Sequence, residues 1–196
     1  MIDYKTILSI IAVALGFIGY GFYLRDVWRG TTRPHVISWF LWCVLELIVF
    51  FAQLAKGGGA GAYVTGMSAL AALIIAITAL KSPDKQIKLF DIVAFGGAII
   101  GIVLWRLTDN PLTAVISVTV ADAFAFSPTY RKSYTKPHEE TLIEYGLAAT
   151  KYTLALFALQ SFNLTTALYP VSIICTNSAF VIMSLVRRKK LKTSIV

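Results

Sequence analysis

The sequence predicts an all-α membrane protein with seven transmembrane helices, arranged as two parallel three-helix repeats joined by a linker helix. Composition is the first reason: 57% of the 196 residues are hydrophobic and 14% are charged, whereas a soluble domain carries about 25% charged residues. An internal repeat is the second reason, because residues 32–35 have the sequence Thr-Arg-Pro-His and residues 135–138 have Thr-Lys-Pro-His. Each run follows a basic segment and precedes a long apolar stretch, which indicates a duplicated unit.

The apolar stretches are long enough, or nearly so, to cross a bilayer as helices. A helix that rises ~1.5 Å per residue needs about 20 residues to cross ~30 Å of hydrocarbon. The first stretch lacks a small-residue cleavage site and leads into a basic loop, so it is expected to be a retained span and not a signal peptide. The fifth is the weakest, because it is short and contains Asp122. The expected spans are residues 6–24, 36–55, 62–80, 89–106, 112–129, 141–160 and 165–186.

Lysine and arginine predict the orientation, since basic residues in short loops stay on the cytoplasmic side. Fourteen of the 18 lysines and arginines fall on one side of the membrane in the expected topology. They follow spans one, three, five and seven: Arg25, Arg29, Arg33, Lys81, Lys85, Lys88, Arg131, Lys132, Lys136, Arg187, Arg188, Lys189, Lys190 and Lys192. The N-terminus is therefore expected outside and the C-terminus in the cytoplasm, and the short loops suggest a bacterial inner (plasma) membrane. Orientation accounts for the net charge of +8, so the expected large partner is the lipid bilayer and no nucleic acid.

On this topology the two Thr-basic-Pro-His runs lie at the starts of the second and sixth spans. The helices then group as three, one and three, and a single linker helix gives both groups the same orientation in the membrane. We expect a first bundle at residues 1–81, the linker helix at 82–107, and a second bundle with a basic tail at 108–196.

The prolines and histidines of the two runs have two interpretations. Pro34, His35, Pro137 and His138 are candidate hinge and repeat-motif residues. Proline is also ordinary in the first turn of a helix, where its missing N–H would have no partner. A histidine at the membrane interface can titrate near neutral pH, or it can be an exposed residue without a role.

A second pattern recurs near the ends of the first and fifth spans. Residues 127–132 have the sequence Ser-Pro-Thr-Tyr-Arg-Lys, followed by Thr141. Residues 21–25, Gly-Phe-Tyr-Leu-Arg, followed by Ser38, match more loosely and lack the proline. The chain thus resembles a divergent relative of the PQ-loop, or SWEET-like, transporters, whose units carry Pro-Gln, a basic turn and then a small hydroxyl residue. Threonine stands here in place of the glutamine. The nicotinamide riboside transporters are a similar seven-helix family.

This resemblance implies a fold and an activity. The family has two three-helix bundles joined by a seventh helix, and it moves small solutes by rocking one bundle against the other. By resemblance Pro128 becomes a further candidate hinge residue, in the fifth span. The family's solute pocket is similar in using tryptophan from the second helix of a unit and asparagine from the third. Trp42 and Asn177 are the matching positions in this chain.

Polar residues at membrane depth mark the expected site, because a charge there costs ~2.5–3.5 kcal/mol on insertion scales and is kept mainly where it faces other helices or a cavity. Glu46, Lys151 and Asn177 each lie about halfway along their spans. Trp39 and Trp42 share a helix face with Glu46, and Tyr145 lies beside the face of Lys151. The predicted substrate-binding residues are Trp39, Trp42, Glu46, Tyr145, Lys151 and Asn177.

The presence of two acidic residues and one lysine at membrane depth predicts proton coupling. Glu46 and Asp122 cannot both pair with Lys151, and a buried carboxylate without an ionic partner binds a proton. The alternative is structural: either acid could pair with Lys151 and lock two helices together. Asn177 could likewise only bond another helix, and Trp39 could be an anchor at the membrane interface.

The expected function is the transport of a small polar solute by alternating access between the two bundles. Two alternatives share the architecture: a receptor that binds a carboxylate or peptide terminus without transport, and a structural subunit of a membrane complex. Whether the chain forms a homo-oligomer is left open. No enzyme activity, cofactor or metal site is expected, because no Cys/His cluster or triad spacing occurs and the glycine-rich residues 57–61 lack the Gly-Lys-Ser/Thr of a phosphate loop.

Overall fold

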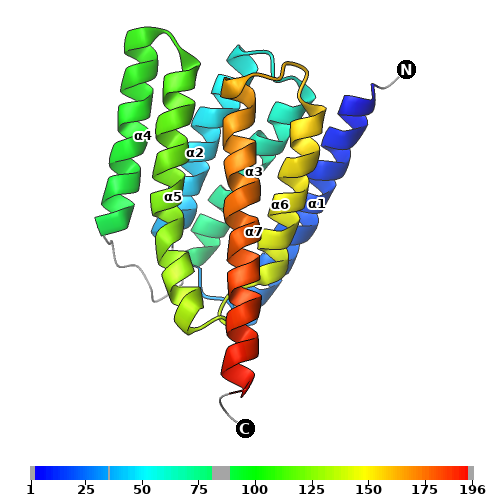
Figure 1. Ribbon diagram of the computed structural model, residues 1–196, viewed down its shortest axis with the longest axis vertical. Coiled ribbons are helices and arrows are strands. Elements are labelled where there is room, and N and C mark those ends of the chain that lie inside the picture. Colours follow the sequence, from blue (N-terminus) through cyan, green and yellow to red (C-terminus); the bar gives the residue numbers. More distant parts are fainter. Residues whose placement is uncertain (1–2, 35, 81–88, 194–196) are drawn as a thin grey trace.

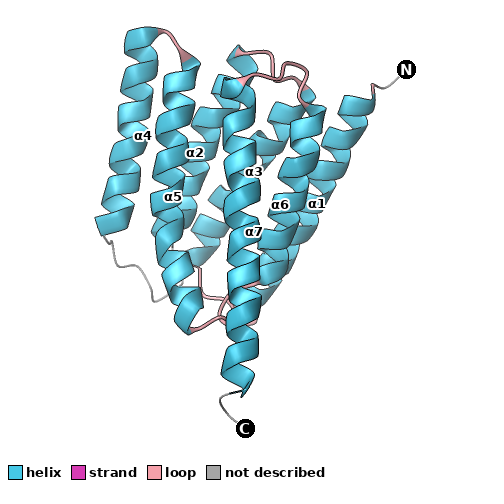
Figure 2. Cartoon of the chain, viewed as in Figure 1, coloured by secondary structure: helices cyan, strands magenta, loops and turns pink. Residues whose placement is uncertain are grey.

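The described residues of the chain form seven α-helices, as the sequence predicts (Figures 1 and 2). The computed structural model describes residues 3–34, 36–80 and 89–193, and these ranges contain no strand. The fold class, an all-α protein, is therefore confirmed. The helices are α1 (Tyr4–Trp28), α2 (Val36–Ala55), α3 (Ala60–Ala79), α4 (Leu89–Thr108), α5 (Pro111–Thr135), α6 (Leu142–Ala158) and α7 (Leu164–Thr193).

The outer surface of the bundle is suited to lipid. Five helices, α1, α2, α3, α5 and α7, are long and apolar enough to cross a membrane. In α4 the apolar helix is shorter, at Phe95–Thr108, and α6 has 17 residues that include two charged side chains. Large apolar side chains cover the outside, among them Phe17, Ile74 and Ile100. Because a soluble monomer rarely exposes such a continuous apolar surface, the chain is an integral membrane protein.

Contacts between the helices follow a regular pattern. Within the first three helices, α3 packs against both α1 and α2; within the last three, α7 packs against both α5 and α6. The two groups meet mainly through α1 with α6 and α2 with α5, and also through α3 with α6 and α2 with α7. Helix α4 stands at the edge of the bundle, mainly against α5 (Figure 1).

The two ends of the bundle differ in charge. The α1–α2 and α5–α6 connections and the C-terminal part of α7 lie at one end (Figure 1). We call this the basic end, because it carries Arg25, Arg29, Arg33, Arg131, Lys132, Lys136 and the basic stretch of α7. The predicted basic residues 81, 85 and 88 and the expected boundary between the first bundle and the linker lie outside the described residues. Lys5, Lys56 and Arg106 lie at the opposite end.

Glycines bring α6 close to α1 and α3. A side chain at Gly19 of α1 would collide with the Glu144 carboxylate of α6, and one at Gly16 would lie 3.3 Å from Lys151 Cδ. On α3, a Cβ at Gly61 would lie 2.7 Å from the carbonyl oxygen of Ala155. Small residues at helix contacts permit this approach. It is the reason that the charged face of α6 can turn toward the bundle interior.

A proline in α7 creates a further tie between the two groups of helices. Pro170 has no N–H, so the carbonyl of Thr166 one turn earlier loses its helical donor. Gln53 of α2 fills that role, since its Nε2 donates to the Thr166 oxygen at 2.9 Å. Inside a membrane a freed backbone group needs such a partner. The bond links α2 to α7 near the opposite end.

Three helices run past their expected ends at the basic end, and α1 does so by four residues, ending at Trp28 and not at residue 24. The prediction ended the fifth span at residue 129, but α5 continues to Thr135, so Pro128 lies inside the helix and the expected basic turn after it is helical. A proline removes one hydrogen bond, and neighbouring helices can support the backbone around it. Likewise α7 continues to Thr193, seven residues beyond the expected end of its span.

The proline-histidine runs occupy different local positions. Pro34 lies two residues before α2, and His35 lies outside the described residues. Pro137 is buried five residues before α6, so the interpretation as a first-turn proline is wrong for this position. Its carbonyl accepts a hydrogen bond from Arg188 Nε at 2.8 Å. His138 is exposed in the α5–α6 connection.

Candidate functional site

A small cavity lies between the first three and the last three helices. Its volume is about 60 Å³, enough for a few water molecules. All seven residues predicted to bind solute or protons line it: Trp39, Trp42, Glu46, Asp122, Tyr145, Lys151 and Asn177. The other lining residues are Tyr20, Ala72, Phe126, Glu144, Ala148, Tyr152, Tyr169 and Ile173. Six helices therefore meet at one polar site.

Lys151 is held by tyrosines. Its Nζ atom donates a hydrogen bond to the Tyr20 hydroxyl at 2.7 Å and lies 4.1 Å from the centre of the Tyr20 ring and 5.4 Å from that of Tyr152. The side chain is 1% exposed. Among the described residues no carboxylate oxygen lies within 4.0 Å of it. The alternative of a direct ion pair between Lys151 and Glu46 or Asp122 is therefore wrong, because ring faces and a hydroxyl stabilise the ammonium group instead.

Three carboxylates share the cavity with this lysine. Glu46, Asp122 and Glu144 are each less than 10% exposed. The Tyr152 hydroxyl donates to Glu46 Oε1 at 2.9 Å, and the Tyr169 hydroxyl lies at the longer distance of 3.4 Å from Asp122 Oδ1. The Oε2 atoms of Glu46 and Glu144 are buried without a hydrogen-bond partner. Two of the three carboxylates thus keep one oxygen without a hydrogen-bond donor.

Asn177 turns its amide toward its own helix. Its Nδ2 donates to the Ile173 carbonyl at 3.0 Å, one turn earlier in α7. The side chain is 6% exposed and lines the cavity. The hydrogen bond therefore fixes the amide at the cavity wall.

Aromatic rings close the cavity toward the basic end. The Trp42 ring lies 4.9 Å from Trp39 and 5.7 Å from Phe126, measured between centroids. Phe126 stacks on Tyr145 at 5.7 Å, with 14° between the ring planes, and both contact Phe180. We call these five residues the aromatic cluster. Trp39 is 5% exposed, so its interpretation as an interfacial anchor is wrong.

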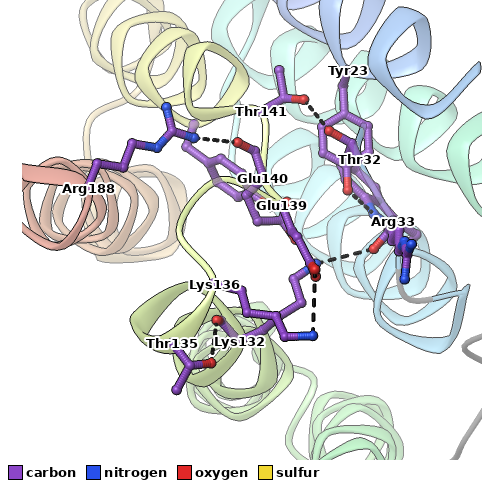
Figure 3. Close-up of polar contacts among 12 residues, drawn as sticks. Tyr23, Thr32, Arg33, Lys132, Thr135, Lys136, Glu139, Glu140, Thr141 and Arg188 are labelled. Carbon is purple, nitrogen blue, oxygen red and sulfur yellow. Dashed lines mark hydrogen bonds and ion pairs between the residues drawn. The ribbon is translucent and has the colours of Figure 1, made fainter. Parts of the chain in front are cut away.

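Beyond this cluster a polar network ties the two groups of helices together at the basic end (Figure 3). The Thr32 and Thr141 hydroxyl oxygens are 2.6 Å apart, and Thr141 donates to Asp26 Oδ2 at 2.9 Å. Lys132 forms an ion pair with Glu140 and donates to the Arg33 carbonyl at 3.2 Å. We call Asp26, Thr32, Lys132, Glu140 and Thr141 the basic-end network.

Glu140 connects this network to the cavity. Its Oε1 pairs with Lys132, while its Oε2 accepts a hydrogen bond at 3.0 Å from the Tyr145 hydroxyl. Burial raises the pKa of Glu140 above its ordinary value, and the Lys132 ammonium opposes that rise. Because Tyr145 lines the cavity, a change in the network reaches the cavity through one side chain.

Lys132→Met is expected to lower the free energy of unfolding by about 1–2 kcal/mol at neutral pH, because it leaves a buried carboxylate without its cation. Loss of the Lys132 ammonium raises the folded-state pKa of Glu140 further. A carboxyl group with a raised folded pKa contributes stability below its unfolded pKa, and that contribution is lost as the pH rises through the folded pKa. The defect should therefore vanish below about pH 4. Denaturation in detergent at several pH values measures it.

The matched control is Lys136→Met. Lys136 pairs with Glu139 at 3.6 Å, and the two side chains are 64% and 32% exposed. A pair this exposed contributes little, so the control should change stability by less than about 0.5 kcal/mol at any pH. An equal loss in both variants would contradict the role given to Glu140.

Sequence reasoning missed part of the site. Glu144 could be placed on the face of Lys151 from their spacing of seven residues, but its distance from the lipid could not be judged. Tyr20, Phe126 and Tyr169 resemble ordinary aromatic residues of apolar spans and gave no separate signal. Tyr152 directly follows Lys151 in the sequence and could be placed with Tyr145 on the neighbouring face of the helix.

Comparison of the chain with protein-family models, with curated proteins and with solved structures finds no match. Within the described residues, no group of His, Cys, Asp or Glu side chains is arranged to hold a metal ion. The geometry of the cavity is therefore the main indication of function.

Proposed function

We propose that this protein transports a small polar solute across a bacterial-type inner membrane by alternating access. The observation that carries the proposal is the cavity itself, which holds three carboxylates and a lysine between two groups of membrane-spanning helices. Each intramembrane charge costs several kcal/mol unless it faces a bundle interior or pathway. A site that retains four of them is better explained by a ligand than by packing.

The contact pattern supports a duplicated fold. In a duplicated fold α1 would correspond to α5, α2 to α6 and α3 to α7. The pair α1–α6 would then correspond to the pair α5–α2, and both pairs pack in this structure. The third helix of each group lies against the other two in both cases. This equivalence favours two parallel three-helix repeats with α4 as the linker, and with it the proposed kinship to the PQ-loop, or SWEET-like, transporters.

Alternating access requires a closed side that can open. The aromatic cluster and the basic-end network lie between the cavity and the basic end, and both cross the boundary between the two groups of helices. Rocking of one group against the other would break the Trp42–Phe126 and Thr32–Thr141 contacts. The positive-inside rule places the basic end, and with it the C-terminus, in the cytoplasm and the N-terminus outside.

The first test is uptake into sealed proteoliposomes. A panel of radiolabelled sugars, nucleosides, vitamins, amino acids, amines and short peptides should include one solute whose uptake saturates. Trp42→Ala should abolish this uptake, because Trp42 forms both the cavity wall and the contact between α2 and α5. Trp28→Ala, at a 74% exposed position, is the control. Binding without uptake of any solute would contradict transport and favour the receptor alternative.

Proton coupling by Glu46 and Asp122 gives a separate expectation. Glu46→Gln and Asp122→Asn, tested one at a time, should flatten the dependence of uptake on external pH, because an amide cannot exchange the proton that a carboxyl group carries. Glu139→Gln at the membrane surface should leave the pH profile unchanged. Wild-type profiles in both cavity variants would exclude coupling through these two residues.

A further inference from the structure

We propose that the solute is a small organic cation bearing N–H donors, a primary ammonium or a guanidinium group, received by the free Oε2 atoms of Glu46 and Glu144. This inference rests on the proposed function, because it takes the cavity to be the solute site. It names the chemical class that the cavity selects.

The charge balance of the cavity favours a cation. Three carboxylates face one ammonium group, so the site carries an excess of acidic groups. An anionic solute would increase that excess and would have to compete for Lys151. The Lys151 ammonium already donates to the Tyr20 hydroxyl and lies over two tyrosine rings. A cation adds the charge that the site lacks.

The hydrogen-bond donors and acceptors of the cavity also favour a cation. Three donors of the cavity are occupied: the Tyr152 hydroxyl donates to Glu46, the Tyr169 hydroxyl to Asp122, and the Asn177 amide to its own helix. The acceptors that remain are the Oε2 atoms of Glu46 and Glu144, both buried without a partner. Buried acceptors without donors are costly. A ligand that supplies N–H groups removes this cost, whereas a ligand rich in acceptors does not.

The walls and the size of the cavity set further limits. Indole and phenyl rings of Trp39, Trp42 and Phe126 line it, and tryptophan faces bind ammonium and guanidinium groups by cation–π attraction. At about 60 Å³ the space admits a group of a few heavy atoms. A bare metal ion fits poorly, because the carboxylates are not grouped as metal ligands within the described residues.

Equilibrium binding to purified protein in detergent tests the class with planar probes of similar size. Methylguanidinium is the cation, N-methylurea the neutral analogue and acetate the anion. Tryptophan fluorescence is the signal, in a background in which Trp28 and Trp105 are replaced by phenylalanine so that Trp39 and Trp42 report. Methylguanidinium should quench saturably at millimolar concentrations, and the other two probes should not.

Variants locate the site. Glu46→Gln and Glu144→Gln should each raise the Kd for methylguanidinium at least about tenfold, because each removes one charge-assisted hydrogen bond. Glu139→Gln, outside the cavity, should leave the Kd within about twofold of wild type. The proposal is overturned if methylguanidinium gives no saturable response, if N-methylurea or acetate binds as tightly, or if neither cavity variant weakens binding.

Loss of the cation site and loss of transport would give different results. Saturable uptake of a neutral or anionic solute that survives Glu46→Gln and Glu144→Gln would overturn the cation and leave transport in place. Methylguanidinium binding with the expected variant pattern, but without flux of any solute through proteoliposomes, would leave the cation site in place and overturn transport.

Discussion

Phe180→Ala is expected to lower the free energy of unfolding by about 3–5 kcal/mol, the range for deleting a large buried aromatic side chain. Phe180 is fully buried. Its ring centroid lies 5.2 Å from Phe126, 5.1 Å from Tyr130 and 4.4 Å from Tyr145. Removal of the ring opens a cavity where α5, α6 and α7 meet. Unfolding in mixed micelles, followed by circular dichroism, measures the change.

Phe17→Ala is the control for this prediction. Phe17 is 62% exposed on the outer face of α1, so removal of its ring breaks few contacts within the protein. We expect the free energy of unfolding to change by less than about 0.5 kcal/mol. If Phe180→Ala were as stable as Phe17→Ala, the aromatic cluster would not hold the last three helices together. Its proposed role as the closed side of the transporter would then also fail.

Gly61→Ala is expected to cost about 1–3 kcal/mol, the range for overpacking a close contact. A Cβ at this position would lie 2.7 Å from the Ala155 carbonyl oxygen and 2.9 Å from the Leu159 backbone nitrogen. Backbone atoms cannot move aside as a flexible side chain can. Helices α3 and α6 must therefore separate, and because they belong to different groups of three, uptake should fall with stability.

Gly146→Ala makes the same change where there is room. Gly146 lies inside α6, and a Cβ there meets nothing within 4 Å. Alanine is the better helix former by about 1 kcal/mol, so this variant should be slightly more stable than wild type. If Gly61→Ala were stabilising to the same extent, the close approach of α3 to α6 would be contradicted.

Together these expectations divide the molecule into residues that hold helices together and residues that bind a ligand. The aromatic cluster and the Gly61 contact hold helices together, and their variants are measured by unfolding. Glu46 and Glu144 line the cavity and each keeps one oxygen without a hydrogen-bond partner, and their variants are measured by ligand binding. Tyr145 belongs to both sets, since its ring is in the cluster and the residue also lines the cavity. Its hydroxyl donates to Glu140 of the basic-end network. It is the side chain through which opening of the basic end would alter the cavity.

Much of the fold could be predicted because membrane helices are local in origin. A run of about 20 apolar residues satisfies its backbone hydrogen bonds within itself, so the seven helices follow from composition along the chain. Their ends were less predictable. The expected turn after Pro128 is helical, because whether a helix continues past a proline depends on neighbours that the sequence does not place.

Some of the candidate site could also be predicted, for an energetic reason. A charged or amide group at membrane depth is expensive wherever it lies, so Glu46, Asp122, Lys151 and Asn177 could be singled out from their positions in the spans. The structure places all four at one cavity. Their partners could not be predicted, since Tyr20 lies 131 positions from the Lys151 that it binds.

The sequence by itself determined the seven helices, the excess of basic residues at one end and the presence of charges that need burial, because each depends on the identity of residues along a single segment. Only the tertiary structure decided which charges meet, that tyrosines and not carboxylates hold Lys151, and that Glu46 and Glu144 keep free oxygens. Those outcomes depend on how closely α1 and α3 approach α6. Glycines such as Gly16, Gly19 and Gly61 permit that approach. The residues next to a glycine in the sequence do not indicate which helix will pack against it.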